Sequence, residues 1–207
     1  MSPSGLCLQK APMPSPAIFL DRDGVLIANR ADYVRRWGEA AILPGVPGAL
    51  ARLAAGPWPI VVVTNQSCIG RGLVAARTVQ GIHRRLRAAL AAQGGRIDAF
   101  YTCPHTPDAG CACRKPQPGL LLQAAQELDL DLAASYLVGD AVGDVQAALA
   151  VGAQPLLVLT GRGAAQAQLL TPHQRAVCPV VADLAAAVGW ILADYAGRKK
   201  NASPTMK

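Results

Sequence analysis

The chain has 207 residues, of which 52% are hydrophobic and only 4% aromatic, and its formal net charge is +7. This length suits one α/β domain with a core built mainly of alanine, leucine and valine, and it leaves little room for two full domains. No apolar run approaches the ~20 residues that cross a bilayer, so we expect no membrane partner.

The positive charge is concentrated near the ends of the chain. Five of the charges belong to Lys10, Arg198, Lys199, Lys200 and Lys207, which leaves +2 for the rest. We therefore expect no nucleic-acid groove and no nucleic-acid partner. Residues 1–16 are rich in proline and serine and are expected to form a loose arm, with a domain over 17–197 and a basic tail over 198–207. The arm lacks the basic segment followed by an apolar segment that is typical of a signal peptide, so we expect a cytoplasmic protein.

Short apolar runs typical of strands alternate with longer amphipathic runs typical of helices. The expected strands are Ala17–Leu20, Ile60–Val63, Ile97–Tyr101, Tyr136–Val138 and Leu156–Leu159. The expected helices are Pro47–Ala55, Ala75–Gln93, Gly119–Leu128, Asp144–Val151 and Asp183–Tyr195. This alternation predicts an α/β fold with a doubly wound, mainly parallel sheet, in which ligands gather beyond the carboxyl ends of the strands. The irregular, polar segment Ala28–Leu43 is a candidate flap over such a site.

Two acidic residues, Asp21 and Asp23, follow the first expected strand. Residues two apart in a strand share a face, and Gly24 allows the chain to turn away, so both carboxylates should lie at the rim of the sheet. Like charges this close repel each other unless a cation or a shared proton separates them. The pair therefore indicates chemistry. The alternative is a turn in which Asp23 is only a local hydrogen-bond acceptor.

A second pair of acids follows the fourth expected strand. Asp21 and Asp140 could share Mg²⁺, with the backbone carbonyl of Asp23 as a third ligand, because this ion prefers a few carboxylate and carbonyl oxygens. Asp144 has the spacing to share a helix face with Asp140 if the helix begins near Asp140. The alternative for Gly139-Asp140 is an ordinary helix N-cap.

Phosphate-binding chemistry is suggested at two more positions. A hydroxyl followed by a donor-rich turn can bind phosphate oxygens, and the residues with this character are Thr64, Asn65, Gln66 and Ser67. Lys115 could neutralise phosphate charge, and Arg114 could hold a second anion. The alternatives are an N-cap at Thr64 and a solvated basic pair at Arg114 and Lys115.

Three of the six cysteines cluster around one histidine. Tetrahedral Zn²⁺ prefers this set of thiolates and imidazole, and the candidate ligands are Cys103, His105, Cys111 and Cys113. All four positions would be filled by protein, so this site, in a zinc loop over 103–113, would be structural and would fix the segment that carries Arg114 and Lys115. Free thiols are the alternative. Cys7, Cys68 and Cys178 stand apart, and no role is assigned to them or to the isolated His83 and His173.

Taken in order, these motifs resemble those of the haloacid dehalogenase superfamily of phosphatases. The matching residues are Asp21-Arg22-Asp23-Gly24, Thr64, Lys115 and Gly139-Asp140-x-x-x-Asp144. The cysteine cluster with Arg114-Lys115-Pro116 looks like the zinc loop of the D-glycero-D-manno-heptose 1,7-bisphosphate 7-phosphatases, and histidinol-phosphate phosphatases have a similar loop. The residues that favour the heptose enzymes are Tyr33-Val34, Thr64-Asn65-Gln66-Ser67, Ile69, Arg71 and Gly72.

The resemblance covers about Ala17 to Gly161 and has three departures. Val25 stands where the first motif often has threonine, and Cys68 stands where the heptose enzymes usually have glycine. The stretch from Asp23 to Tyr33 is one residue longer than their usual pattern.

The resemblance implies a Rossmann-like fold. The length of the chain leaves no room for a large cap domain, and we expect a small monomer. The resemblance further implies that Asp21 attacks phosphorus to form an aspartyl-phosphate, that Asp23 is the general acid and base, and that Thr64 and Lys115 stabilise the transferred group. It also implies that Asp140 holds Mg²⁺ and that Asp144 orients Lys115 or a metal-bound water. The residues it implies for substrate binding are Asp21, Arg22, Asp23, Tyr33, Thr64, Asn65, Gln66, Ser67, Arg114 and Lys115. Of these, Arg114 would bind the phosphate that is not cleaved or another anionic part of the substrate.

The expected function is therefore Mg²⁺-dependent removal of the 7-phosphate from the heptose bisphosphate, a small-molecule substrate. Two enzymatic alternatives remain, a histidinol-phosphate phosphatase and a phosphatase of another small sugar phosphate. A third hypothesis is a non-catalytic zinc module that binds nucleic acid through the basic tail, but acids at strand ends would repel a phosphate backbone.

Overall fold

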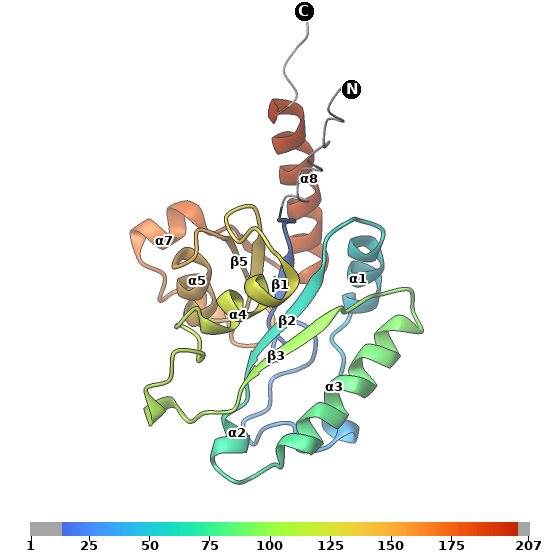
Figure 1. Ribbon diagram of the computed structural model, residues 1–207, viewed down its shortest axis with the longest axis vertical. Coiled ribbons are helices and arrows are strands. Elements are labelled where there is room, and N and C mark those ends of the chain that lie inside the picture. The colour runs from blue at the N-terminus through green and yellow to red at the C-terminus, as the bar shows by residue number, and fades with distance from the viewer. Residues whose placement is uncertain (1–13, 203–207) are drawn as a thin grey trace, which may run out of the picture.

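The computed structural model describes residues 14–202, and its central element is a six-stranded parallel sheet (Figure 1). The strands are β1 (Ile18–Leu20), β2 (Ile60–Asn65), β3 (Ala99–Cys103), β4 (Tyr136–Gly139), β5 (Gln154–Val158) and β6 (Val180–Val181). Their spatial order is β3-β2-β1-β4-β5-β6, with Phe19 of β1 opposite Val61 on one side and Leu137 on the other. The predicted doubly wound parallel sheet is confirmed. The strand order reverses at β1 and β4, which is where such sheets bind ligands.

Helices cover both faces of the sheet (Figure 1). They are α1 (Val46–Ala54), α2 (Ser67–Gly70), α3 (Ala76–Ala91), α4 (Gly119–Leu128), α5 (Val142–Leu149), α6 (Gly163–Ala167), α7 (Pro172–Val177) and α8 (Leu184–Ala202), with two 3₁₀ turns, η1 (Trp37–Glu39) and η2 (Pro107–Ala109). None of the helices in this part of the chain combines the length and apolar character needed to cross a membrane.

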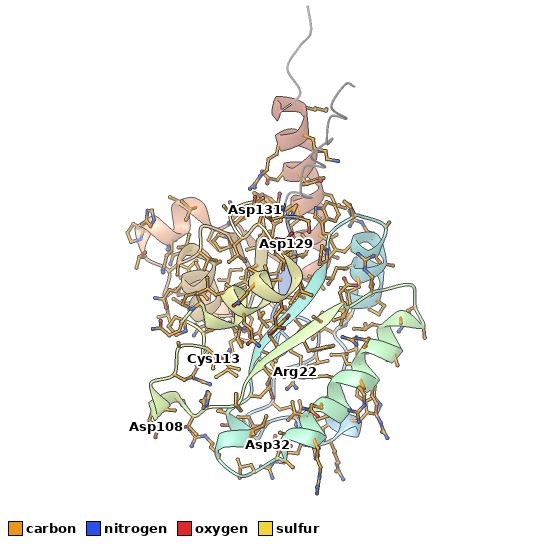
Figure 2. All side chains as sticks on the ribbon, viewed as in Figure 1. Arg22, Asp32, Asp108, Cys113, Asp129 and Asp131 are labelled. Atoms are coloured by element: carbon orange, nitrogen blue, oxygen red, sulfur yellow. The ribbon has the colours of Figure 1, made fainter. Side chains whose placement is uncertain are left out.

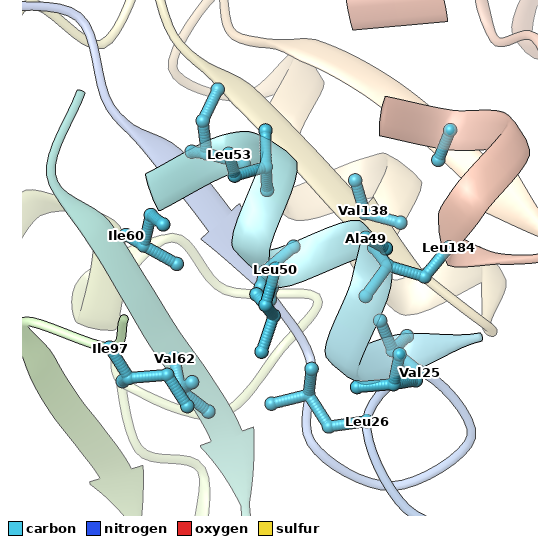
Figure 3. Packing of buried hydrophobic residues seen from close by; sticks show 14 of the residues in the cluster. Val25, Leu26, Ala49, Leu50, Leu53, Ile60, Val62, Ile97, Val138 and Leu184 are labelled. Atoms are coloured by element: carbon cyan, nitrogen blue, oxygen red, sulfur yellow. The ribbon is translucent and has the colours of Figure 1, made fainter. Parts of the chain in front are cut away.

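Alternate residues of the central strand belong to two different cores. Ile18 and Leu20 of β1 pack with α1, α3 and α8, whereas Phe19 packs with α4 and α5 on the other face. This division follows from the two-residue period of a strand. In the first core, Leu50 of α1 lies against the sheet near Val62 (Figure 3). Fully burying one such side chain contributes roughly 1.5–3 kcal/mol, so the strand ends are held by a well-packed scaffold.

Several boundaries differ from those expected. β3 begins at Ala99 and not at Ile97, because the backbone N–H and the side chain of Asp98 both bond to the backbone of Ile60 and close the entry to the strand. β2 continues through Thr64 to Asn65, so these residues belong to the strand end. The pattern did not predict β6, α2, α6 or α7, which are too short to show a clear period.

The ends of the expected domain are only partly described. α8 runs past Tyr195 to Ala202, so Arg198 and Lys200 belong to a helix. Residues 1–13 of the expected arm and 203–207 of the expected tail lie outside the described residues, and the boundaries proposed for the domain stay a prediction.

Candidate active site

A polar cavity of about 610 Å³ lies at the carboxyl end of the sheet. Asp21 follows β1, Thr64 lies in β2 and Asp144 lies in α5, directly after β4. Leu20 is in register with Val62 and with Val138, so these parallel strands run side by side to the same edge of the sheet, where their polar residues face one space. Asn29, Tyr33 and other residues of the segment 28–43 also line the cavity, as expected for a flap.

Lys115 is the central cation of the cavity floor. Its Nζ lies 3.0 Å from Oδ1 of Asp21 and 2.6 Å from Oδ1 of Asp144, and it donates a 2.8 Å hydrogen bond to the carbonyl of Val63. Burial alone would lower the pKa of Lys115, but the carboxylates of Asp144 and Asp21 outweigh it and raise this pKa above its usual range. The lysine is therefore a fixed positive charge.

Three buried acids form one cluster, with carboxylate oxygens from Asp21, Asp140 and Asp144 all within 4.8 Å of one another. Burial is the main cause that raises the pKa of Asp144, to about 6, and the neighbouring charges of Asp21 and Asp140 add to it. Hard oxygen ligands around a small volume with excess negative charge fit Mg²⁺, which takes few protein ligands. The cluster therefore fits the predicted cation site.

Asp140 is held from several sides. Its carboxylate accepts hydrogen bonds from the side chain of Asn29 and from the backbone N–H of Arg162 at 2.9 Å, and it forms an ion pair with the Arg162 guanidinium at 3.2 Å. Gly24 and Gly161 both have positive φ, and a Cβ on either would collide with this carboxylate. The chain is closely fitted around Asp140.

The structure corrects the expectation that Asp140 and Asp144 share a helix face. α5 begins at Val142 with Ala141 as its N-cap, so Asp140 lies before the helix. Asp144 is in the first turn, where its carboxylate accepts a 3.1 Å hydrogen bond from the backbone N–H of Ala141. The two acids meet because the strand end and the helix start are adjacent, and not through helical spacing.

Asp23 lies at the cavity in a network of donors. Nη2 of Arg22 donates to both carboxylate oxygens of Asp23 at 3.0 and 2.9 Å, and also to Oε1 of Gln66 at 2.8 Å. Nε2 of Gln66 donates to Asp23 and to Oγ1 of Thr64. Arg22 was expected to bind the substrate, but its side chain is only 1% exposed and its guanidinium contacts Asp23.

Asn65 and Ser67, from the segment that was expected to bind phosphate, connect other parts of the site. Asn65 exchanges two hydrogen bonds with the backbone of Lys115, at 3.0 and 3.1 Å, and so ties β2 to the lysine. The Tyr33 hydroxyl lies 3.3 Å from Oγ of Ser67, which joins the flap segment to α2 across the cavity. Arg114 lines the cavity beside Lys115.

The four expected zinc ligands come together between β3 and Lys115. Sγ of Cys103 lies 3.7 Å from Sγ of Cys111, which is 3.6 Å from Sγ of Cys113, and Nδ1 of His105 is 3.2 Å from that last sulfur. These distances match the edges of a tetrahedron, about 3.8 Å between sulfurs that each lie about 2.3 Å from Zn²⁺. The cluster fits a structural zinc site. Cys113, labelled in Figure 2, directly precedes the pair Arg114 and Lys115 in the sequence.

Several polar cavity residues were not among the predicted site residues, namely Asn29, Arg30, Arg71, Arg162 and Gln166. Arg162 could have been found, because it follows the fifth expected strand and every neighbouring strand end carries site residues. The others lie on irregular or very short segments, where no such positional rule applies.

Comparisons with known proteins agree on one family. The model of the haloacid dehalogenase-like hydrolases matches residues 23–149, and a second, HAD-hydrolase-like model matches residues 112–187. The chain is 46% identical over 146 residues to the D-glycero-beta-D-manno-heptose-1,7-bisphosphate 7-phosphatase of Pseudomonas putida, covering 70% of this chain and 83% of that protein. It is 46% identical over 140 residues to the corresponding alpha-heptose enzyme of Mycobacterium tuberculosis, covering 66% and 73%.

A solved structure is similar over nearly its whole length. The crystal structure of the D,D-heptose 1,7-bisphosphate phosphatase from B. bronchiseptica, complexed with magnesium and phosphate, has a TM-score of 0.80 and 41% sequence identity. The match covers 86% of this chain and 99% of that chain.

Proposed function

The chain belongs to the haloacid dehalogenase-like hydrolases, and from this premise we propose that it is a phosphatase that removes the 7-phosphate of D-glycero-D-manno-heptose 1,7-bisphosphate. The names of the relatives support this substrate, and the magnesium and phosphate of the B. bronchiseptica structure support the chemistry. The relatives include both a beta-heptose and an alpha-heptose enzyme, so the proposal covers either anomer.

One observation carries the proposal. Asp21 lies at the floor of an open cavity with its Oδ1 3.0 Å from the buried ammonium of Lys115. A carboxylate fixed this way is an oriented nucleophile, and the adjacent cation can stabilise charge that develops on a phosphoryl group.

In this proposal, Asp21 attacks phosphorus and its new P–O bond forms as the bond to the sugar oxygen breaks. Asp23 gives its proton to that departing oxygen, then takes one from the water that cleaves the aspartyl-phosphate. Lys115 and Thr64 hold the phosphoryl oxygens in place. Mg²⁺ bound by Asp21 and Asp140, with the carbonyl of Asp23, would supply further neutralisation of phosphate charge, and Asp144 keeps Lys115 oriented.

The charges around the cavity favour a bisphosphate over histidinol phosphate. The guanidinium-bearing residues that line it and are not paired with Asp23 or Asp140 are Arg30, Arg71 and Arg114. Of these, Arg114 is our candidate for the phosphate that is not cleaved, because it lies next to Lys115 and is only partly buried. Histidinol phosphate carries a cation at its other end, which this surface would repel.

A phosphate-release screen tests the proposal. Purified protein is assayed with the alpha and beta heptose 1,7-bisphosphates, other sugar bisphosphates and histidinol phosphate, each with and without Mg²⁺. We expect the highest kcat/KM on a heptose bisphosphate and loss of turnover without Mg²⁺. Faster turnover of histidinol phosphate, or no phosphate release from any substrate, contradicts the proposal.

We also propose that the enzyme acts as a monomer in the cytoplasm and binds no nucleic acid. Support for the cytoplasmic location comes from the cysteines of the described residues, which are all free thiols, and three of them lie in a cluster that could hold a metal, as is usual in a reducing compartment. Light scattering on the purified protein checks the oligomeric state.

A further inference from the structure

We infer that His83 of α3 is a positioning residue for leaving-group protonation, acting through Arg22 on Asp23. This inference rests on the proposed function, in which Asp23 is the general acid. No residue of α3 lines the active-site cavity among the described residues, so His83 would act without touching the substrate.

The contact between His83 and Arg22 fixes the state of the imidazole. Nε2 of His83 lies 3.1 Å from Nη1 of Arg22. A guanidinium only donates hydrogen bonds, so Nε2 must be the acceptor and the ring proton must be on Nδ1. Burial is the main cause that lowers the pKa of His83, to about 3, and the charges of Arg22 and Arg87 lower it further. The ring is therefore a neutral acceptor at any ordinary assay pH.

The other edge of the same guanidinium holds Asp23. Nη2 of Arg22 is shared between the two carboxylate oxygens of Asp23 and the amide oxygen of Gln66. A guanidinium is planar and rigid, so an acceptor that fixes Nη1 also fixes the direction in which Nη2 points. His83 thereby sets the orientation of the Asp23 carboxyl relative to the departing oxygen.

His83 is itself held firmly. Its ring stacks on Phe100 of β3 with centroids 4.5 Å apart and planes 11° apart, and it lies on the buried face of α3 with Val79 and Ile82. Its hydrogen bond to Arg22 points toward the active site. Such a buried acceptor on a rigid helix is suited to positioning, since general-acid catalysis depends on the geometry of proton transfer.

The expected defect depends on the leaving group. As the bond between phosphorus and the sugar oxygen breaks, the proton of the Asp23 carboxyl passes to that oxygen. Otherwise a strongly basic alkoxide would depart. A p-nitrophenolate leaves without protonation, so p-nitrophenyl phosphate does not need this proton. The ratio kcat/KM includes only steps up to formation of the aspartyl-phosphate, so the later role of Asp23 toward water does not enter it.

The test compares His83→Phe, which keeps the ring and removes the acceptor, with His83→Gln, which restores an amide acceptor near Nε2. We expect His83→Phe to lower kcat/KM on heptose 1,7-bisphosphate by about 10-fold or more, which is part of the ~10²–10⁴-fold acceleration that general-acid catalysis supplies. On p-nitrophenyl phosphate, kcat/KM should fall by less than about twofold. His83→Gln should recover most of the loss. Leu86→Val, which trims another side chain on the buried face of α3 and keeps the His83 acceptor, is the matched control and should affect both substrates alike.

His83→Leu is a second acceptor-free variant if His83→Phe does not fold. Equal losses on the two substrates, or no loss on either, overturn the inference while the wild-type activity leaves the proposed function intact. A wild-type protein that hydrolyses neither substrate contradicts the proposed function and therefore also the inference about His83.

Discussion

Nζ of Lys115 lies 2.6 Å from Oδ1 of Asp144, and both side chains are almost completely buried. The same ammonium also contacts Asp21, so one lysine faces two carboxylates of a three-acid cluster. Uncompensated buried charge is costly, so the excess negative charge favours binding of a cation, and the lysine is placed to meet the phosphate. This balance of charge governs how the site responds to substitution.

Asp21→Asn should abolish phosphate release and leave the fold intact. The amide cannot attack phosphorus, and its loss of charge relieves repulsion from Asp140 and Asp144, so the metal-free melting temperature should not fall. Turnover and thermal melting are measured together. Asp32→Asn, at an exposed acid on the flap segment, is the control and should keep wild-type activity. Substantial phosphate release by pure Asp21→Asn protein contradicts the assignment of the nucleophile.

Lys115→Met should both inactivate and destabilise the protein. Removing one partner of a buried ion pair leaves Asp21 and Asp144 unpaired, which costs about 3–5 kcal/mol. Urea denaturation measures the free energy of unfolding. The double variant Lys115→Met with Asp144→Asn should regain much of the stability but none of the activity. A single variant as stable as wild type would show that this ion pair does not stabilise the fold.

Removal of zinc should lower activity by loosening the segment that carries Lys115. Cys111→Ser should lose metal, measured by elemental analysis, and should show a lower kcat with little change in Mg²⁺ affinity, because the zinc and acidic clusters share no ligand. Cys178→Ser, at a buried cysteine outside the cluster, should retain zinc. Full activity in protein shown to be free of zinc would overturn this view.

His83 should make stability depend on pH. Its pKa in the folded protein is about 3, below the ordinary 6.5, so the unfolded chain takes up the proton first as pH falls. The contribution of neutral His83 to the free energy of unfolding is complete above about pH 6.5. It is lost as the pH falls toward 3, by at most about 1.4 kcal/mol per pH unit. His83→Gln removes this dependence. Urea denaturation at pH 7 and pH 4.5 should show a smaller decline for the variant, and equal declines contradict the prediction.

The main features of the fold could be predicted from sequence. Five of the six strands and the five longer helices were expected near their observed positions, because apolar runs and amphipathic periods are local signals. The errors lie where tertiary contacts decide. Asp98 closes the start of β3 through bonds to Ile60, and β6 has two residues, too few for any periodicity. The final turns of α8 carry the charges of Arg198 to Lys200, whose polar character resembles that of a tail.

The sequence could predict that polar residues gather at one edge of the sheet, but it could not predict which contacts they make. Parallel strands end at one edge, so polar residues after each strand had to gather there, and the structure brings Asp21, Lys115 and Asp144 into contact. The pattern could not show that Arg22 faces Asp23 and His83 or that Arg162 reaches Asp140, because these contacts depend on how the elements pack. The chemical roles of these residues remain predictions.

The sequence by itself determined the parallel α/β fold, the four residues of the cysteine cluster and the family, because each depends on residue types at fixed local spacing. Only the tertiary structure decided which partner each charged side chain takes. A buried carboxylate or guanidinium is satisfied by whatever lies within about 3 Å, and this is set by how strands and helices pack and not by distance along the chain. The pairing of Lys115 with Asp144, and of Arg22 with His83, belongs to the packed structure alone.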